Sequence, residues 1–361
     1  MSRLPQKLKS IRWPLVLPFL VLALLAAAYG VWWTSLAARI ETTLVDWQTE
    51  QAAQGIDVAW TDLGAGGFPY RLEIHLTDPS IGTSGPDGWS WAADHMTGQL
   101  LPYNLDHVII DVPGKQTVRY ATINNGASEH FVLHLNSESF WASFVDEGGD
   151  EQRFALDMGN LVANRERATG GSIPQLAGSA AATRLQFHAR PTAGANGTAF
   201  DAALRGEDLS WTGFGETPWP GATIARLDVQ ARLSNLPENL SRALPVLLPD
   251  AAANGTTLAI SEFTLHWGAI DMTGHGEVTL DDRGRPEGRF RTSVGNLDGL
   301  IAALVEADIV SQRSAGLAFA GITALSSLQG ADPGRVNLPV AMKEGVLFLG
   351  PIAVARLDPV Y

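Results

Sequence analysis

Histidine side chains at one place in the sequence have a spacing that could support metal binding. His130 and His134 are the closest histidine pair. Residues four apart on a β-strand share a face, so the pair could ligate a metal ion. A zinc site needs a third protein ligand, and none lies nearby in the sequence. Because Phe131, Leu133 and Leu135 alternate with the histidines, the pattern favours two solvated histidines on the polar face of a strand.

Two other groups near residue 280 have both a chemical and a structural interpretation. The segment Gly274–Gly276 could expose the imidazole of His275, but flanking glycines in a strand are more typical of a bulge or a close packing contact. Asp281, Asp282 and Glu287 could bind a cation. A charged hairpin turn in solvent explains the same residues without a ligand.

No motif with a known catalytic mechanism is present. The sequence lacks H-E-x-x-H, a P-loop, a G-x-S-x-G elbow, S-x-x-K and an EF-hand loop. Trp89 and Trp91 could contact a sugar or a lipid, although core packing is the more ordinary role of such a pair. The paired carboxylates of a glycosidase cannot be assigned, because their separation depends on tertiary structure. The sequence therefore predicts no catalytic residue, no cofactor and no metal, and a protein that is not an enzyme.

The amino-acid composition excludes further functions. The 361 residues include no cysteine, which excludes disulfides, cysteine nucleophiles and thiolate-ligated metal centres. The formal net charge is -13, and an acidic balance argues against nucleic-acid binding. The charge is unevenly distributed. Residues 1–33 hold four basic and no acidic residues, so the other 328 residues hold 21 basic and 38 acidic ones.

The segment Trp13–Trp33 contains no charged residue and predicts a transmembrane helix. Its 21 residues would form a helix about 31 Å long at 1.5 Å per residue. A bilayer core is about 30 Å thick. Four aromatic residues near its two ends fit the two interfacial belts and are the predicted membrane-anchor residues: Trp13, Tyr29, Trp32 and Trp33. The basic residues before the span place residues 1–12 in the cytoplasm and residues 34–361 in the periplasm.

Two alternatives to an uncleaved anchor remain open. Ala26–Ala28 could be the cleavage site of a signal peptide, although the apolar run continues past it and is long for a signal. The run could also be a buried helix of a soluble core. Both the anchor and the signal peptide export the bulk of the chain.

Residues 34–54 predict a second helical stretch. Leu36, Ile40, Leu44 and Trp47 recur on one helical face, and Gly55 is a plausible C-cap. This helix could continue directly from the membrane span and place its apolar stripe against the first strands of the exported domain.

Beyond Ile56 the pattern changes to the strict alternation of half-buried strands. In Ile224–Leu233, the polar residues Arg226 and Asp228 point to one side, with Leu227 and Val229 on the other. The alternation indicates antiparallel strands with one wet and one dry face. The other predicted strands are Tyr70–Thr77, Phe131–Leu135, Leu185–Arg190, Leu258–Ile260, Phe263–Trp267, Gly276–Leu280, Gly288–Val294, Val336–Val340 and Gly345–Leu349.

Two helical patches and one loop-rich stretch divide the exported chain. Helices are expected near 239–248 and 297–328, the second with Asn296 as its N-cap. Residues 164–198 are rich in small residues and predict a loop-rich connection between β-rich halves at 34–163 and 199–361. The predicted fold class is mainly β (α+β): an N-terminal transmembrane helix, then a curved, mostly antiparallel β-sheet domain with a few helices.

Several short segments carry a resemblance to a known family. They are Gly66–Leu72, Leu76–Pro79, Trp89–Trp91, Leu101–Asn104, His107–Ile109, Pro113-Gly114 and Gly345–Pro351. Together with the N-terminal span they resemble the bacterial envelope family called domain of unknown function 2125, seen mainly in alphaproteobacteria. The resemblance covers nearly the whole chain, and it implies no activity because its motifs are structural turns and strands.

A looser similarity links the segment Gly274–Phe290 to AsmA-like envelope proteins. Those proteins are anchored in the inner membrane, β-rich in the periplasm and associated with lipid handling. The similarity implies an envelope protein that binds or shelters a lipid or another apolar ligand. A scaffold for other envelope proteins is the alternative, and an envelope hydrolase is disfavoured by the missing motifs. The expected partners are thus the inner membrane and a possible lipid, with no nucleic acid and with protein partners unknown. A dry sheet face must be covered either by the protein's own helices or by a ligand.

Overall fold

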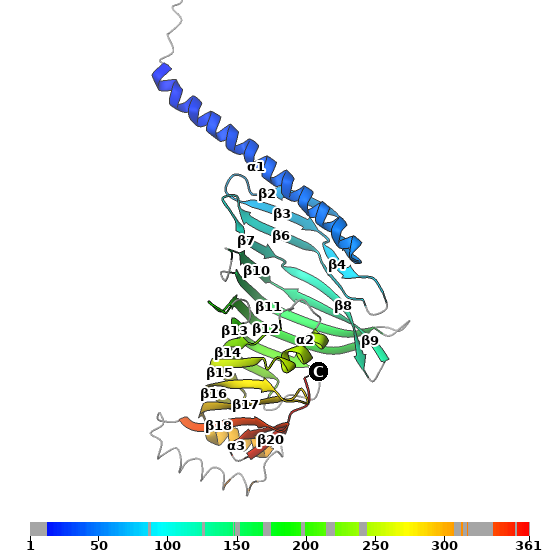
Figure 1. The fold of residues 1–361 in the computed structure, drawn as a ribbon, viewed down its shortest axis with the longest axis vertical. Coiled ribbons are helices and arrows are strands. Elements are labelled where there is room, and N and C mark those ends of the chain that lie inside the picture. Colours follow the sequence, from blue (N-terminus) through cyan, green and yellow to red (C-terminus); the bar gives the residue numbers. More distant parts are fainter. Residues whose placement is uncertain are drawn as a thin grey trace, which may run out of the picture.

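The computed structural model describes residues 13–85, 88–124, 127–146, 148, 152–168, 175–195, 199–213, 221–237, 244–306, 312, 316, 335–350 and 352–360. One long helix and one large antiparallel sheet dominate this part of the chain (Figure 1).

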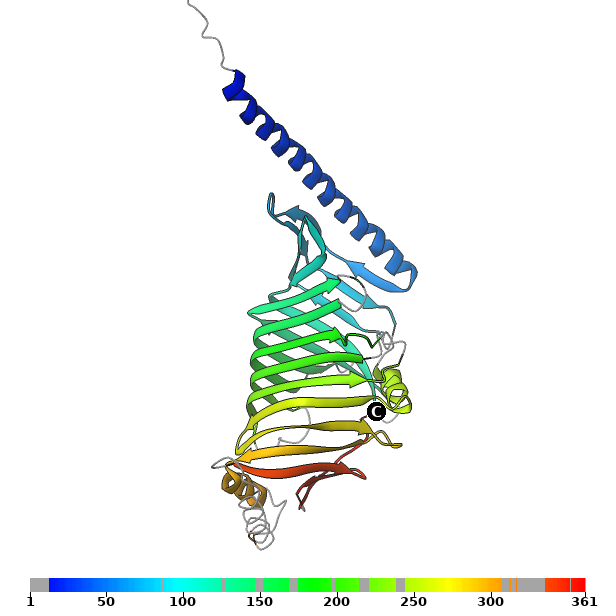
Figure 2. The same cartoon turned by 60° about the vertical axis from the view of Figure 1, so that its left-hand side comes forward.

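The helix α1 (Trp13–Ala53) is continuous over 41 residues and joins the predicted span to the predicted second helical stretch. Gly55 lies two residues after the end of α1. Its φ of 79° and the hydrogen bond from its amide to the Ala52 carbonyl confirm the predicted C-cap. The N-terminal half of α1 extends beyond the sheet, whereas its C-terminal half lies against the first strands (Figures 1 and 2). Only 6% of its most apolar window is buried. A core helix would be mostly buried, so the soluble-core alternative is wrong.

In the part of the chain that the structure describes, twenty strands form the sheet, and every pairing is antiparallel. They are β1 (Ile56–Ala59), β2 (Asp62–Gly66), β3 (Leu72–Thr77), β4 (Ser80–Thr83), β5 (Ser90–Ala93), β6 (His95–Leu101), β7 (Asn104–Asp111), β8 (Gly114–Asn124), β9 (Ala127–Ser137), β10 (Ser139–Asp146), β11 (Gln152–Ala168), β12 (Gln175–Pro191), β13 (Ala199–Thr212), β14 (Thr223–Ser234), β15 (Thr257–Trp267), β16 (Ile270–Leu280), β17 (Pro286–Gly295), β18 (Arg335–Lys343), β19 (Val346–Leu349) and β20 (Ile352–Arg356).

The sheet forks at β11, one of its two longest strands. Residues 152–159 of β11 pair with β10, and residues 162–168 pair with β9. One branch then runs through β10, β7, β6, β3 and β2, and the other through β9, β8, β5, β4 and β1. Both branches end beside α1, which contacts β1 and β2. On the other side of β11, each strand pairs with the next as far as β20 (Figure 2, green to red).

One sequence expectation about organisation needs correction. The stretch 164–198, expected to be a loop-rich connection, holds the end of β11 and all of β12. Many of its described small residues lie inside β12, where Ala180 pairs with Ala163 and Ala182 is buried. The sheet therefore continues through the expected boundary.

Among the described residues, the helix α2 (Leu244–Ala253) follows β14 and the helix α3 (Leu297–Glu306) follows β17. The helix α2 overlaps the patch expected near 239–248 and continues through Pro249. The helix α3 begins the patch expected at 297–328, and most of the remainder of that patch lies outside the described residues. Asn296 is the N-cap of α3, since its Oδ1 accepts a bond from the Gly299 amide at 3.2 Å.

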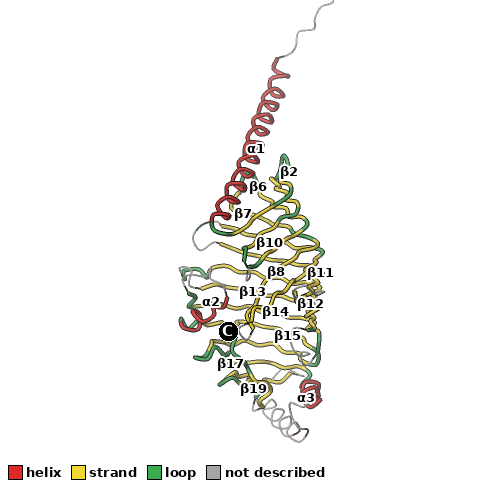
Figure 3. The backbone as a smooth tube through the Cα atoms, turned by 90° about the vertical axis from the view of Figure 1, so that its right-hand side faces the viewer, coloured by secondary structure: helices red, strands yellow, loops and turns green. Residues whose placement is uncertain are grey.

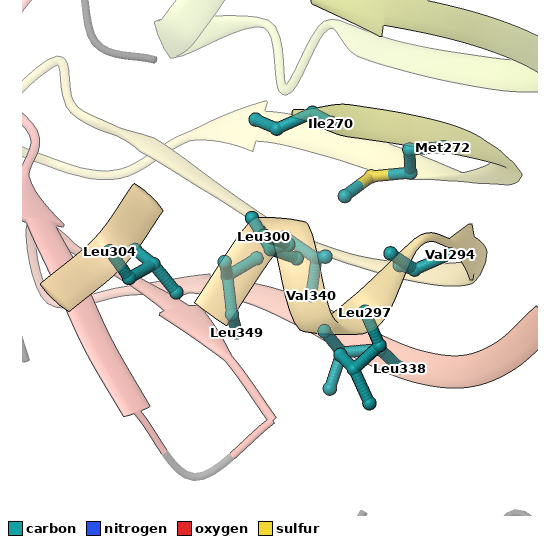
Figure 4. Close-up of a cluster of buried hydrophobic side chains, with 9 residues drawn as sticks. All are labelled: Ile270, Met272, Val294, Leu297, Leu300, Leu304, Leu338, Val340 and Leu349. Atoms are coloured by element: carbon teal, nitrogen blue, oxygen red, sulfur yellow. The ribbon is translucent and has the colours of Figure 1, made fainter. Parts of the chain in front are cut away.

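Two clusters of buried apolar side chains hold helices against the sheet, one at each end. At the α1 end, Trp33 and Ala37 pack on Leu72 and Ile74. At the other end, α3 packs on strands β16 to β19 (Figures 3 and 4). That cluster consists of Ile270, Met272, Val294, Leu297, Leu300, Leu304, Leu338, Val340 and Leu349.

Candidate functional site

One face of the sheet carries an unbroken line of apolar or glycine positions from the α1 end to the α3 end. Strand register makes each position the direct partner of the next across thirteen strands. We call this line the apolar row. It consists of Leu72, Leu100, Val108, Phe144, Phe154, Ala189, Ala202, Ala231, Ile260, Gly276, Phe290, Val340 and Leu349.

The ends of the apolar row are buried and its middle is open to solvent. Leu72 is 0% exposed under α1, and Leu349 lies in the α3 cluster. Between them Phe144 is 44% and Phe154 38% exposed. The ring of Phe154 contacts Phe187 on the same face, with 6.2 Å between centroids. Within the described ranges, the helices that take part in the buried clusters are α1 and α3, at the two ends.

The opposite face of the same strands is charged. The alternation predicted for Ile224–Leu233 is confirmed, because Arg226, Gln230 and Arg232 are exposed while Leu227 and Val229 are half-buried. Arginine–aspartate pairs connect neighbouring strands on this face at 2.5–2.8 Å: Arg184–Asp157, Arg205–Asp228 and Arg232–Asp201. Exposed pairs of this kind add little stability each, but they identify the solvated face.

The arginines also set the ionisation of their partners. A side-chain hydrogen bond from Arg232 lowers the pKa of Asp201. Arg184 does the same for Asp157. For Asp228 burial raises the pKa, but hydrogen bonds from Arg205 and Arg226 outweigh it and leave the pKa lowered. These three carboxylates therefore remain charged at neutral and mildly acidic pH.

An open groove with a volume of about 1850 Å³ runs across these strands, and charged-face residues make up most of its lining. Eight positions of the apolar row also contribute to the lining: Phe154, Ala189, Ala202, Ala231, Ile260, Gly276, Phe290 and Val340. Small side chains such as Ala155, Ala203 and Ala341 are part of its lining. Its charged and histidine lining is Arg153, Arg190, Arg232, Arg289, Arg291, Asp201, Glu277, Glu287, His107, His188 and His275. Five arginines against three acidic residues make the groove basic, although the whole chain carries a net charge of -13.

The histidine pair lies on the solvated face of β9. Phe131 is buried and pairs with Arg167, while His134 pairs with Asn164 and lies 3.6 Å from Glu166. In the part of the chain that the structure describes, no group of three or more histidine, cysteine or acidic side chains could hold a metal ion. The histidines are placed as the alternation predicts.

The glycines around His275 permit close packing, as the sequence suggested. A Cβ at Gly274 would lie 2.9 Å from the Phe263 ring, and one at Gly276 would lie 2.6 Å from the Phe290 ring. His275 itself is exposed and faces the groove. Only glycine leaves room for these aromatic rings on the apolar face.

Asp281 organises the turn between β16 and β17. Its carboxylate accepts bonds from the Arg285 side chain at 2.7 and 2.8 Å and from the amides of Arg283 and Arg285 at 2.9 Å. Arg285 also donates to the Glu344 carbonyl at 3.0 Å, which ties this turn to the β18–β19 turn. Asp281, one of the three carboxylates that could bind a cation, is thus occupied by protein donors.

These bonds predict a pH dependence of stability. The hydrogen bonds from the side chain and backbone of Arg285 lower the pKa of Asp281 to about 2, from 3.8. A lowered native pKa stabilises the fold above the unfolded-state value, and that contribution disappears as the pH falls from about 4 towards 2. We expect Asp281→Asn to lower the melting temperature at pH 7 and to flatten its fall between pH 4 and 2, as followed by circular dichroism. Asp282→Asn, at the exposed neighbouring residue, is the control, and an equal effect of both variants would contradict the assignment.

The tryptophan pair is divided between two environments. Trp91 is half-buried and its Nε1 donates to Gln116 Oε1 at 3.0 Å, while Trp89 is 43% exposed just before β5. The predicted core-packing role therefore fits Trp91 and does not fit the exposed Trp89.

The predicted anchor residues all lie on α1, and two of them also contact the sheet domain. Trp13 begins the helix and Trp32 is exposed. Tyr29 donates to the Pro69 carbonyl at 2.5 Å, and Trp33 Nε1 donates to the Arg71 carbonyl at 3.2 Å. The sequence predicted that these aromatic residues anchor the span in the membrane. It did not predict that Tyr29 and Trp33 also contact the sheet domain.

Comparison with protein families adds one finding. A family described as "Uncharacterized protein conserved in bacteria (DUF2125)" matches residues 33–358. No curated protein and no solved structure is detectably similar to the chain.

Proposed function

The chain belongs to the DUF2125 family of bacterial proteins, and from the geometry of this member we propose that it is a non-enzymatic, membrane-anchored protein that shelters lipid acyl chains on the apolar row. The anchor is α1, the described helix long and apolar enough to span a membrane.

The observation that carries the proposal is the continuity of the apolar row. Half-exposed phenylalanines on a sheet face keep apolar surface in contact with water, at a cost of about 25 cal/mol per Å². An acyl chain lying across the strands would remove that contact without requiring any specific polar group. The row begins at Leu72, which packs against α1, so its first positions lie close to the membrane helix.

The proposed location is the periplasmic side of the inner membrane. Four basic residues precede the uncharged span and none of the first 33 residues is acidic, which favours a cytoplasmic N-terminus. The chain has no cysteine, so its fold does not depend on disulfide formation in that compartment.

Photo-crosslinking at two adjacent residues of β10 tests the proposal. Phe144 belongs to the apolar row, and Val145 lies on the opposite face. We expect benzoyl-phenylalanine at position 144 to form lipid adducts in cells, detected by mass spectrometry, and the same group at position 145 to form several-fold fewer. Equal lipid adducts at the two positions, or none at position 144, would refute acyl-chain binding on the row.

A scaffold role is a second candidate, and the basic groove on the charged face favours it. The groove is complementary in charge to an acidic segment of another protein, and its volume of about 1850 Å³ accommodates an extended peptide. Val145 lines this groove, so the crosslinking experiment separates the two candidates. An acidic peptide crosslinked at position 145, with no lipid at position 144, would favour the scaffold.

A further inference from the structure

Two neighbouring hairpins of the sheet domain carry the same short sequence, an apolar residue followed by proline and an exposed tyrosine. The β2–β3 turn contains Phe68-Pro69-Tyr70, and the β6–β7 turn contains Pro102-Tyr103 directly after Leu101, the last residue of β6. Leu72 pairs with Leu100, which places the two turns side by side at one edge of the sheet. Each turn therefore presents an exposed tyrosine at the same edge, and the β2–β3 turn adds the exposed Phe68, whereas Leu101 is half-buried and Pro102 is buried.

The tyrosines of these turns are among the most exposed large side chains described. Tyr70 is 83% and Tyr103 80% exposed, and Phe68 is 55% exposed. Isolated exposed apolar residues are ordinary on a protein surface, but three large ones gathered at one edge mark an interaction surface. Tyrosine is suited to a membrane interface because its ring is apolar and its hydroxyl is polar.

Contacts with α1 fix where this edge lies relative to the membrane. Tyr29 bonds to Pro69, and the Trp33 ring meets the Phe68 ring edge-on with 5.5 Å between centroids. Tyr29 lies one helical turn before Trp33, about 6 Å along the axis. If Trp13–Trp33 crosses the bilayer, a turn bonded to Tyr29 must reach the depth of the lipid headgroups.

The charges of the turns agree with this depth. Residues 67–71 and 100–104 contain no acidic residue, although the chain as a whole has 38. Their one basic residue, Arg71, lies 2.6 Å from Glu73 and is therefore paired. Neither turn would bring an uncompensated negative charge to an anionic lipid surface.

We propose that the β2–β3 and β6–β7 turns form a second contact with the bilayer, in which Phe68, Tyr70 and Tyr103 enter the boundary between headgroups and acyl chains beside α1. The partner is the lipid surface itself. The contact holds the sheet at one orientation to the membrane, with Leu72 and Leu100, the first two positions of the apolar row, directly behind the inserted turns.

The absence of cysteine allows a direct measurement of depth. Tyr70→Cys and Tyr103→Cys, each carrying a nitroxide label, are reconstituted as the full chain in phosphatidylethanolamine–phosphatidylglycerol vesicles. Both side chains are largely exposed, so the substitutions leave the packed core untouched. Asp282→Cys, in the exposed turn between β16 and β17 far from α1, is the matched control (Figure 1).

We expect labels at positions 70 and 103 to collide with a water-soluble nickel complex several-fold less often than the label at position 282, and with oxygen more often. Equal nickel accessibility at all three positions would overturn the proposal. Protection of positions 70 and 103 from both reagents would also overturn it, because it would show that protein, such as a second copy of the chain, covers the turns. Neither outcome depends on whether the apolar row binds lipid.

Discussion

Glutamate at both Phe144 and Phe154 is expected to remove most of the lipid that, on the proposed function, co-purifies with the detergent-extracted protein. The two residues are direct partners across β10 and β11 in the open middle of the apolar row. A carboxylate at each position would have to lose its hydration when an acyl chain lies over it, which costs several kcal/mol without a compensating bond. Because about 1.4 kcal/mol corresponds to a tenfold change in affinity, we expect a loss of at least about tenfold.

The fold should survive this double substitution, since both rings are already partly in water. Val145→Glu with Ala155→Glu is the matched control. It adds the same charge to the same two strands, one residue away and on the opposite face. Bound lipid per protein is measured by mass spectrometry after extraction. Retention of lipid by the Phe144→Glu, Phe154→Glu protein, or an equal loss in the control, would exclude the apolar row as the binding surface.

Leu300→Ala is expected to give the largest loss of stability. Leu300 is 1% exposed and lies at the centre of the contact between α3 and strands β16 to β19 (Figure 4). Truncating a buried leucine to alanine removes apolar contacts and leaves a cavity, which together cost about 2–5 kcal/mol. The denaturant midpoint of the purified protein should fall accordingly.

Leu105→Ala is the control for that measurement, because it makes the same chemical change at a leucine that is 45% exposed. We expect it to change the free energy of unfolding by less than about 1 kcal/mol. An equally small effect of Leu300→Ala would mean that α3 does not hold the far end of the sheet. Greater binding of a hydrophobic dye to native Leu300→Ala would show that α3 covers the end of the apolar row.

Local patterns predicted much of the fold because they depend on neighbours in sequence. The strict alternation in Ile224–Leu233 gave the correct strand and the correct faces, and Gly55 and Asn296 gave the correct helix boundaries. The composition of 164–198 was misleading, since small residues that loosen a loop also suit a strand packed closely against others. Composition alone does not distinguish these two uses.

The candidate site was less predictable because it depends on register. Each strand showed its own apolar side, but alignment of Phe144 with Phe154, and of Phe154 with Ala189, arises from pairing between distant segments. The fork at β11 has the same origin, because no local signal shows that one strand pairs with two different neighbours. The repeated Pro-Tyr turns were visible in the sequence, and their proximity became evident only from the pairing of Leu72 with Leu100.

The length of the apolar row bears on how far an acyl chain bound to it could move. Strands in a sheet lie about 4.8 Å apart, so its thirteen positions extend over roughly 58 Å, about twice the thickness of a bilayer core. On the proposed function, an acyl chain displaced by one strand spacing would exchange one apolar neighbour for another, because the row contains no polar position. The row would then let a bound acyl chain slide along it rather than hold it at one position. The open middle of the row lies between two helix-covered ends, one beside α1 and the other under α3.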